Sequence, residues 1–501
     1  EIELADWLFN IYLSRFGKVL LLNKPLSARR IHSGGIFSSM KPIEVANNVL
    51  SSISTYNNFF EYKYDNEFEI ARNPYLFSLN RNNSLLTHEI IVNCDVFPSE
   101  KSGFSYNEIT WILRKYKKSL SLVTGNAYKW IENKSIEYGI FQYKKKNKEL
   151  ADRVWRYDYE KPLKTKMLYS IFLHDAYYYM LPLVKKIKAP FCFELYPGGG
   201  FELNSVRSDH QLRVLFSSPY FRKVICTQKI TVDYLLKKKL CRKENIFFIF
   251  GGITATKSKD HGKYFGEKPV MDIAFVANKY ANITDKGFDI FCEVAKKLSS
   301  KYNNINFHVV GNHSANDYDL TGIKNIKFYG RKDVGWLQNF YCNIDIILSP
   351  NFKNAAQKNG EFDGFLLDTC ILAANQGVAI FATDPLHLNE NHFKDNEDIV
   401  IVKHDINDIV NKINFYYNNS HLLIDLAKKG KVKVNMTYSY ESQMEPRFKV
   451  FDECISGKLK PMKKSFSFIL LNIFDFFYTI KLKTKIRTRI INFIKGKNIY
   501  A

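Results

Sequence analysis

At 501 residues the chain is too long for one compact core, so we expect two domains with appendages. Hydrophobic residues make up 46% and charged residues 25% of the sequence, a balance that argues against wholesale disorder. The formal net charge of +23 favours an anionic partner: nucleic acid, a phospholipid surface or a phosphorylated substrate.

The eight cysteines are scattered along the chain, and no two have the CxxC spacing of a zinc site or a redox dithiol. Most lie in apolar runs such as Ala-Pro-Phe-Cys-Phe, which predicts buried thiols in a reducing, cytoplasmic compartment. The chain begins at Glu1 rather than Met and shows no signal peptide, so we expect an upstream domain in the parent chain.

Residues 1–85 show no repeating strand and helix pattern, and we interpret them as an N-terminal extension or a linker from that upstream domain. The apolar-rich stretch at residues 5–13 predicts a helix. Residues 51–83 are rich in Asn, Tyr and charge, which is typical of a surface connection.

Short apolar runs separated by helix-length segments follow, and they predict buried parallel strands at residues 89–95, 120–124, 170–174, 191–195, 223–227 and 246–250. A polar segment, residues 254–268, interrupts the pattern as a linker. Strands then resume at residues 272–277, 305–310, 326–329, 344–348, 378–382 and 399–402. The sequence therefore predicts two Rossmann-like doubly wound α/β domains, residues 86–255 and 268–455, with a ligand in the cleft between them.

The tail, residues 456–501, changes character. Residues 466–480 are strongly apolar, and Lys and Arg alternate with Ile and Phe as far as residue 497. The segment is too short and too charged to span a bilayer. We interpret it as basic amphipathic helices on an anionic membrane face, the alternative being a helix that packs on the first domain with its lysines in water.

Two motifs in the second domain carry the predicted chemistry. Lys279 and Lys286 flank a loop between a strand and a helix, where backbone N–H groups and the positive helix end face an anion. The alternative is a solvated basic loop. Residues 360–377 form an acidic loop with glycine, a helix with Thr369 near its start and a closing Gly377. Glycine lets the backbone approach a ligand, and a capping hydroxyl or N–H can hold a phosphate.

In this order the motifs resemble the retaining GT-B glycosyltransferases of family 4 over residues 268–455, and the first domain resembles them more loosely. The resemblance implies a metal-independent hexosyltransferase that needs no cofactor beyond its nucleotide diphosphate-sugar donor. The tail and the basic charge favour a glycan or lipid-linked acceptor and a role in bacterial surface polysaccharide synthesis, such as lipopolysaccharide or capsule.

The resemblance also assigns roles to residues. Lys286 and Lys279 match basic residues that neutralise the diphosphate, and Asp363 stands where the family has the glutamate that contacts the sugar, with Glu361 as a substitute. Further donor contacts are implied by position in loops that face the cleft: Gly364, Phe365, Thr369, Gly330, Arg331, Ser102, Gly103, Gly199 and Gly200. The triple glycine that ends at Gly200 has a simpler alternative as a flexible turn.

The chain departs from the family pattern at several positions. Leu372 replaces the glutamate that holds the ribose, and leucine accepts no hydrogen bond. Glu194 and Tyr196 occupy the loop where many relatives place a histidine, while His174 and Asp175 are either acceptor-side groups or a structural pair. A catalytically silent GT-B module that serves as a partner or scaffold subunit is therefore an alternative. The basic residues are not interleaved with aromatics in a reader motif, so we predict no nucleic-acid partner.

Overall fold

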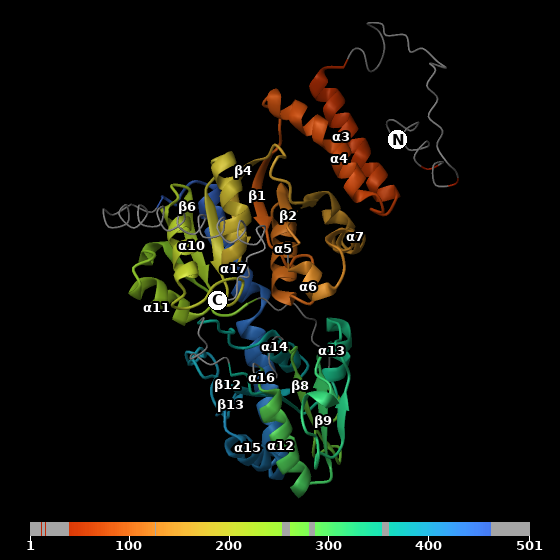
Figure 1. Ribbon diagram of the computed structural model, residues 1–501, viewed down its shortest axis with the longest axis vertical. Helices are drawn as coiled ribbons and strands as arrows, with labels where there is room; N and C mark the ends of the chain where they lie inside the picture. Colours follow the sequence, from red (N-terminus) through yellow and green to blue (C-terminus); the bar gives the residue numbers. More distant parts are fainter. Residues whose placement is uncertain are drawn as a thin grey trace, which may run out of the picture. The chain divides into compact units, whose positions relative to one another are not determined.

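The computed structural model describes residues 12, 16, 40–125, 127–252, 261–279, 286–352 and 360–461 (Figure 1). Most of the predicted N-terminal helix at 5–13 and the whole predicted amphipathic stretch at 466–497 lie outside these residues. None of the helices in the described part of the chain is long and apolar enough to cross a bilayer.

Two helices, α3 (Pro42–Phe59) and α4 (Asp65–Arg81), occupy the region predicted as a surface connection, so that prediction was wrong. Proline at the first helical position suits the start of α3 because the first turn needs no N–H from it. Buried Val49, Ile53 and Tyr56 follow one another at helical spacing and pack into a core with α4.

Polar composition concealed this helix pair. Asn57 is fully buried in α3, and its side-chain amide donates to Oδ1 of Asp65 over 2.6 Å. The same carboxylate pairs with Nζ of the buried Lys144 at 2.5 Å. An Asn-rich stretch is compatible with a packed helix when its buried amide N–H groups find such acceptors.

The first sheet has seven strands in the order β3-β2-β1-β4-β5-β6-β7. Their bounds are β1 (Thr87–Asn93), β2 (Ser119–Val123), β3 (Val154–Arg156), β4 (Lys164–Ile171), β5 (Phe191–Leu195), β6 (Phe221–Cys226) and β7 (Ile246–Phe248). Each predicted strand of this region overlaps one of them, whereas the three-residue β3 escaped prediction because it is too short to show a pattern.

The helices that accompany this sheet are α5 (Gly103–Lys115), α6 (Tyr128–Glu132), α7 (Ile136–Lys146), α8 (Leu173–Asp175), α9 (Leu181–Ile187), α10 (Val206–Ser217) and α11 (Lys229–Lys237). Serine caps the start of two of them: the Ser135 hydroxyl accepts from the N–H of Tyr138, and the Ser205 hydroxyl accepts from the N–H of Ser208. Such caps satisfy N–H groups that the first helical turn leaves without partners.

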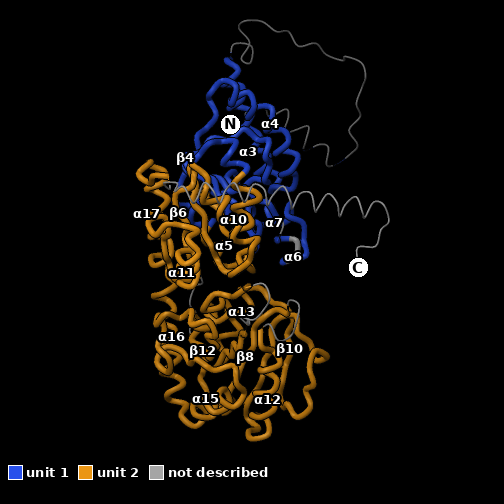
Figure 2. Tube along the Cα trace, turned by 60° about the vertical axis from the view of Figure 1, so that its left-hand side comes forward, with its two compact units in different colours: residues 1–99, 109–168, 182–189 blue, residues 100–108, 169–181, 190–501 orange. Residues whose placement is uncertain are grey.

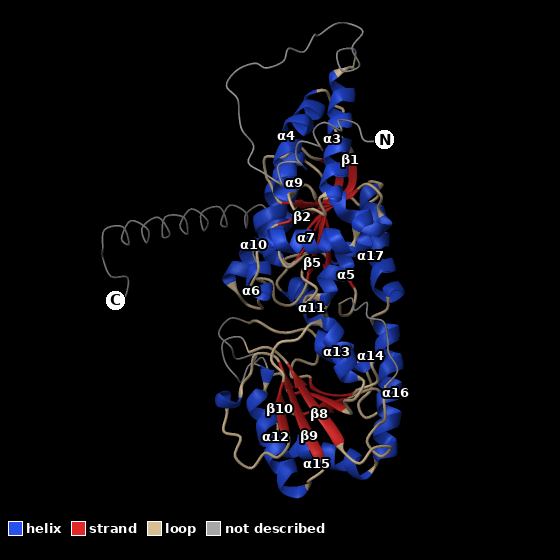
Figure 3. Cartoon of the chain, turned by 90° about the vertical axis from the view of Figure 1, so that its right-hand side faces the viewer, coloured by secondary structure: helices blue, strands red, loops and turns tan. Residues whose placement is uncertain are grey.

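The second sheet has six strands in the order β10-β9-β8-β11-β12-β13. They are β8 (Met271–Val276), β9 (Ile305–Val310), β10 (Ile326–Phe328), β11 (Ile346–Ser349), β12 (Ala379–Thr383) and β13 (Val400–Val402), and all of their pairings are parallel. Every strand predicted for this region is confirmed within a few residues. Figure 3 shows these strands with helices on both sides of the sheet.

The helices of this region are α12 (Phe288–Lys301), α13 (Val334–Tyr341), α14 (Asp368–Asn375), α15 (Ile406–Asn418), α16 (Ser420–Thr437) and α17 (Tyr440–Ile455). Apolar faces of α12, α15 and α16 close the core of the sheet. In both sheets the first strand stands centrally, β1 beside β4 and β8 beside β11, and ligands of such sheets bind beyond the carboxyl ends of the strands at this reversal.

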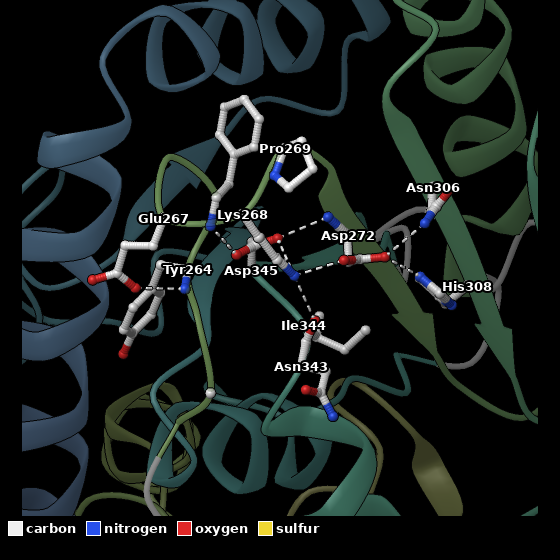
Figure 4. A network of polar contacts seen from close by, with 12 residues as sticks. Tyr264, Glu267, Lys268, Pro269, Asp272, Asn306, His308, Asn343, Ile344 and Asp345 are labelled. Atoms are coloured by element: carbon white, nitrogen blue, oxygen red, sulfur yellow. Dashed lines mark hydrogen bonds and ion pairs between the residues drawn. The ribbon is translucent and has the colours of Figure 1, made fainter.

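The segment before β8 is held by a buried ionic network (Figure 4). Lys268 Nζ lies 2.6 Å from Asp272 Oδ2 and 3.0 Å from Asp345 Oδ2. Although burial opposes it, hydrogen bonds from His308, Lys268 and Asn306 lower the pKa of Asp272 to about 2. The carboxylate is therefore charged throughout the physiological range and fixes the entry to the second sheet.

The chain divides into two compact units (Figure 2). The first comprises residues 1–99, 109–168 and 182–189, and the second comprises residues 100–108, 169–181 and 190–501. All contacts described below for the candidate site lie within the second unit.

Candidate donor-binding site

Lys286 and Asp363 form an ion pair at the carboxyl edge of the second sheet. The lysine side chain is 11% exposed and the aspartate side chain 22%, so both still reach solvent. Asn351, just beyond β11, donates from Nδ2 to Asp363 Oδ2 over 2.9 Å. The hydroxyl of Thr383, the last residue of β12, donates to the carbonyl of Asn351. Folding thus brings two of the predicted catalytic residues together.

Gly287 places this lysine. It precedes α12 with φ +75°, a left-handed conformation that favours glycine. A Cβ at this position would lie 2.2 Å from the carbonyl oxygen of Pro350, at the end of β11. The start of α12 therefore abuts the strand next to β8, which fixes Lys286 at the sheet reversal.

Lys279 belongs to a second group at the same edge. Its Nζ lies 2.7 Å from Asp317 Oδ1, an ion pair that lowers the pKa of that carboxyl. The backbone N–H of Lys279 donates to Asn312 Oδ1 over 2.6 Å, and Asn312 Nδ2 donates to the Lys279 carbonyl over 3.0 Å. The ends of β8 and β9 are thereby clamped together, with the lysine held at their edge.

The loop that carries Gly330 and Arg331, two of the predicted donor contacts, lies beside this clamp. The N–H of Gly311 donates to the carbonyl of Gly330 over 3.1 Å, and Arg331 is exposed. A Cβ built at Gly330 would contact none of the described residues, so the backbone here is open to a ligand. The structure therefore places the loop of the predicted Gly330 and Arg331 beside the strand end that holds Lys279.

The acidic loop is anchored through its backbone. The carbonyl of Gly360 accepts from the N–H of Leu203 over 2.9 Å, and the carbonyl of Phe365 accepts from Gln228 Nε2 over 3.3 Å. The ring of Phe365 is buried, so only the backbone at Gly364 and Phe365 can face a ligand. Glu361 is exposed in the same loop and stands two residues from Asp363.

The triple glycine packs closely on the end of β4. A Cβ at Gly199 would lie 2.2 Å from a ring carbon of Phe172, and one at Gly200 would lie 3.2 Å from Cβ of His174. The backbone N–H of His174 donates to the Gly199 carbonyl over 3.1 Å, and its Nδ1 lies 2.7 Å from the same oxygen. This loop continues to Phe201, whose ring meets that of Phe362 with centroids 6.1 Å apart. This close packing explains why residues without side chains stand at Gly199 and Gly200. It also places their loop beside the acidic loop.

Ser102 and Gly103 lie at the start of α5. The Ser105 hydroxyl donates to Ser102 Oγ over 2.8 Å, and a Cβ built at Gly103 would contact none of the described residues. The next residue, Phe104, stacks on Tyr196 with ring centroids 4.3 Å apart. Tyr196, which stands in the loop where many relatives place a histidine, therefore has a packing role, and burial raises its pKa well above the ordinary value.

Glu194, the other residue named at this departure from the family pattern, lies within β5. It is fully buried, and Arg447 of α17 donates from Nε to Oε2 over 2.9 Å and from Nη2 to Oε1 over 3.2 Å. Tyr169 bonds to the same carboxylate and to Glu108, whose pKa burial raises to about 8. This cluster attaches α17 to β5, which is a structural role.

The start of α14 carries Thr369 as its second residue, and no side chain caps the helix. Asp368 opens the helix, and burial raises its pKa to about 6. Leu372 is buried in the same helix, so the position expected to hold a ribose offers only an apolar side chain. The helix start therefore remains a candidate phosphate contact, whereas the Leu372 side chain has no group that could hydrogen-bond a ribose.

Sequence reasoning missed Asn351, Asn312 and Asp317. The first two were detectable, since each follows the end of a strand by two residues, at the edge where ligands of parallel sheets bind. Asp317 lies in a short helical turn far along the loop, and only the fold shows that it meets Lys279.

No protein-family model matches the chain, and no curated protein does. Solved structures do match. HepE from Anabaena, solved with UDP and glucose, is 12% identical over 73% of this chain and 100% of its own, with a TM-score of 0.53. Sucrose-phosphate synthase from Thermosynechococcus elongatus is 12% identical over 74% of this chain and 100% of its own, with a TM-score of 0.51.

TarM of S. aureus is also similar, at 19% identity and a TM-score of 0.44, over 57% of this chain. This chain covers 55% of the length of TarM. The architecture shared with HepE and sucrose-phosphate synthase, two Rossmann-like parallel sheets within one chain, defines the class: the chain has the GT-B fold.

Proposed function

We propose that this chain is a retaining glycosyltransferase that moves a sugar from a nucleoside diphosphate-sugar to an acceptor hydroxyl. The observation that carries the proposal is the Lys286–Asp363 pair at the reversal of the second sheet, held there by Gly287 and Asn351. It offers a cation for a phosphate and, next to it, a carboxylate for sugar hydroxyls, and both remain reachable from solvent.

The proposed reaction uses the chain's own charges in place of a metal. The bond between the anomeric carbon and the β-phosphate oxygen breaks, and Lys286, Lys279 and the start of α14 near Thr369 stabilise the charge that the departing diphosphate gains. Asp363, with Glu361 nearby, orients sugar hydroxyls. The acceptor hydroxyl attacks from the face that the diphosphate leaves, and a β-phosphate oxygen takes its proton.

The net charge of the chain supports a proposal for the acceptor and for the cellular location of the enzyme. The formal charge of +23 and the basic, apolar-rich sequence of residues 462–501 favour a cytoplasmic enzyme on the inner membrane face, with a glycan or lipid-linked acceptor of surface polysaccharide synthesis. HepE was solved with UDP and glucose, which makes UDP-glucose the first donor to test.

One observation favours a second candidate, a catalytically silent GT-B module. Leu372 is buried where a ribose-binding glutamate is expected, so the expected hydrogen-bond acceptor for the ribose of the donor is missing. A silent module would leave every nucleotide-sugar intact, with and without acceptor extracts.

The test is a thermal-shift and isothermal-titration screen of UDP, GDP and ADP, followed by hydrolysis assays with the matching sugars. Lys286→Ala should weaken binding of the preferred diphosphate by about 10- to 100-fold, the loss expected for a charged hydrogen bond of about 1.5–3 kcal/mol. Lys428→Ala, an exposed lysine on α16, is the matched control and should bind like the wild type. Equal affinity of wild type and Lys286→Ala would refute the assignment of the site.

A further inference from the structure

A basic pocket of about 370 Å³ lies at the amino ends of β6 and β7. The side chains that matter for its chemistry are Arg222, Lys223, Arg242, Glu244, Lys458 and Lys460. It stands at the opposite edge of the first sheet from the glycine loop after β5, so it is separate from the candidate donor site.

The inner wall of the pocket is fixed by backbone contacts. Arg222 donates from Nη1 to the carbonyls of Pro219 and Phe221 over 2.9 and 3.0 Å. The buried Asn245 donates from Nδ2 to the carbonyl of Arg222 over 2.8 Å. Burial lowers the pKa of the Arg222 guanidinium, although arginine remains charged at neutral pH. This wall therefore presents a positioned cation.

The rim of the pocket carries more positive charge than its single carboxylate, that of Glu244, can neutralise. Lys223 Nζ bonds to the backbone carbonyl of Glu244, and Arg242 Nη1 lies 3.7 Å from the Glu244 carboxylate. Lys458 and Lys460 make no ion pair with any of the described residues. Five cations thus face one carboxylate, a formal excess of four positive charges in one pocket.

We propose that this pocket binds the phosphate group of an anionic membrane lipid. A phosphate accepts several charge-assisted hydrogen bonds at once, which suits arginine and lysine side chains that converge from two strand ends and from the segment after α17. The excess positive charge of the pocket is complementary to the negative charge at the surface of an anionic leaflet.

Sequence continuity favours a lipid as the source of the phosphate. The pocket is lined as far as Lys460 and Pro461, and the chain continues directly into the apolar and basic sequence of residues 462–501. A soluble phosphate compound would need no such neighbour, whereas a bilayer engages both apolar and basic residues. Lipid binding in this pocket would be independent of sugar transfer at the donor site.

The experiment measures co-sedimentation of the full chain with vesicles of phosphatidylcholine alone and with added phosphatidylglycerol, over a range of salt concentrations. The pocket variant is Lys458→Glu with Lys460→Glu. Its matched control, Lys263→Glu with Lys428→Glu, changes the charge equally at exposed lysines elsewhere. Both pairs lie on the surface, so both proteins should fold, which their melting temperatures will show.

We expect the pocket variant to bind phosphatidylglycerol vesicles about tenfold more weakly than the control variant does. Unchanged binding, or an equal loss in both variants, would overturn the pocket and leave only diffuse attraction. If inorganic phosphate or glycerol phosphate bound the pocket more tightly than the vesicles do, the lipid source would be overturned. It would also be overturned if the pocket variant, but not the control variant, lost binding to an oligonucleotide. Nucleotide thermal shifts should be the same in all three proteins, which separates this test from that of the donor site.

Discussion

Replacing Arg447 with methionine tests what holds α17 to the first sheet. The guanidinium is fully buried and donates to Glu194 from two nitrogens, at 2.9 and 3.2 Å. Its Nη1 also donates to the backbone carbonyl of Gln443 over 2.7 Å. Methionine fills much of the same volume but provides none of these hydrogen bonds.

The expected cost follows from what the substitution leaves behind. Glu194 would remain buried with its cation removed, and Glu108 lies in the same cluster, with Oε2 3.5 Å from Arg447 Nε. Removing one partner of a buried ion pair costs about 3–5 kcal/mol. For an unfolding unit of about 300 residues, with an unfolding entropy of about 2.1 cal/mol/K per residue, this is a fall of about 5–8 °C in Tm.

Differential scanning calorimetry at pH 7 measures this fall, with Lys449→Met as the matched control because Lys449 is exposed on the same helix. Combining Arg447→Met with Glu194→Met should restore part of the lost stability, since the second change removes the unpaired buried charge. If Arg447→Met melted within 1 °C of Lys449→Met, about the shift expected for a surface change, the reasoning from burial and pairing would be refuted.

Two further predictions concern Gly287 and Glu108. Gly287→Ala should lower Tm and weaken diphosphate binding more than Gly457→Ala does. Both sites have φ +75°, but only a Cβ at Gly287 would meet backbone, at 2.2 Å. Calorimetry and titration of both variants will check this, and equal effects would contradict it. Burial raises the pKa of Glu108 from 4.5 to about 8, so the folded protein holds this proton more tightly than the unfolded chain does. The stability of the wild type should therefore decline as the pH rises from 4.5 to 8. Glu108→Gln should flatten this decline, and an unchanged pH profile of Tm would contradict the prediction.

The candidate site was predictable in part. Lys286 and Gly287 stand directly before a helix that follows a buried strand, a pattern that predicts an anion-binding loop from local sequence alone. Asp363 was identified through family resemblance. That the two form an ion pair, 77 residues apart, required the parallel order of the second sheet, in which β8 and β11 become neighbours.

Other residues show where sequence patterns mislead. The two helices within residues 42–81 were overlooked because buried Asn57 is polar, and its burial is tolerable only through the bond to Asp65. Family resemblance places Glu194 and Tyr196 where many relatives have a histidine, but Glu194 lies within β5 and Tyr196 directly after it. Both side chains contact residues that are distant in the sequence, so no local pattern reveals these partners.

The alternation of apolar runs with helix-length segments determined by itself that this chain builds two parallel sheets, because period and burial are local properties of sequence. Only the tertiary structure decided the partners of its charged groups. Arg447 meets Glu194 across 253 residues, and five cations from three separate segments converge in one pocket. Pairing of buried charges depends on which strands and helices become neighbours, and that order arises from packing of the whole chain.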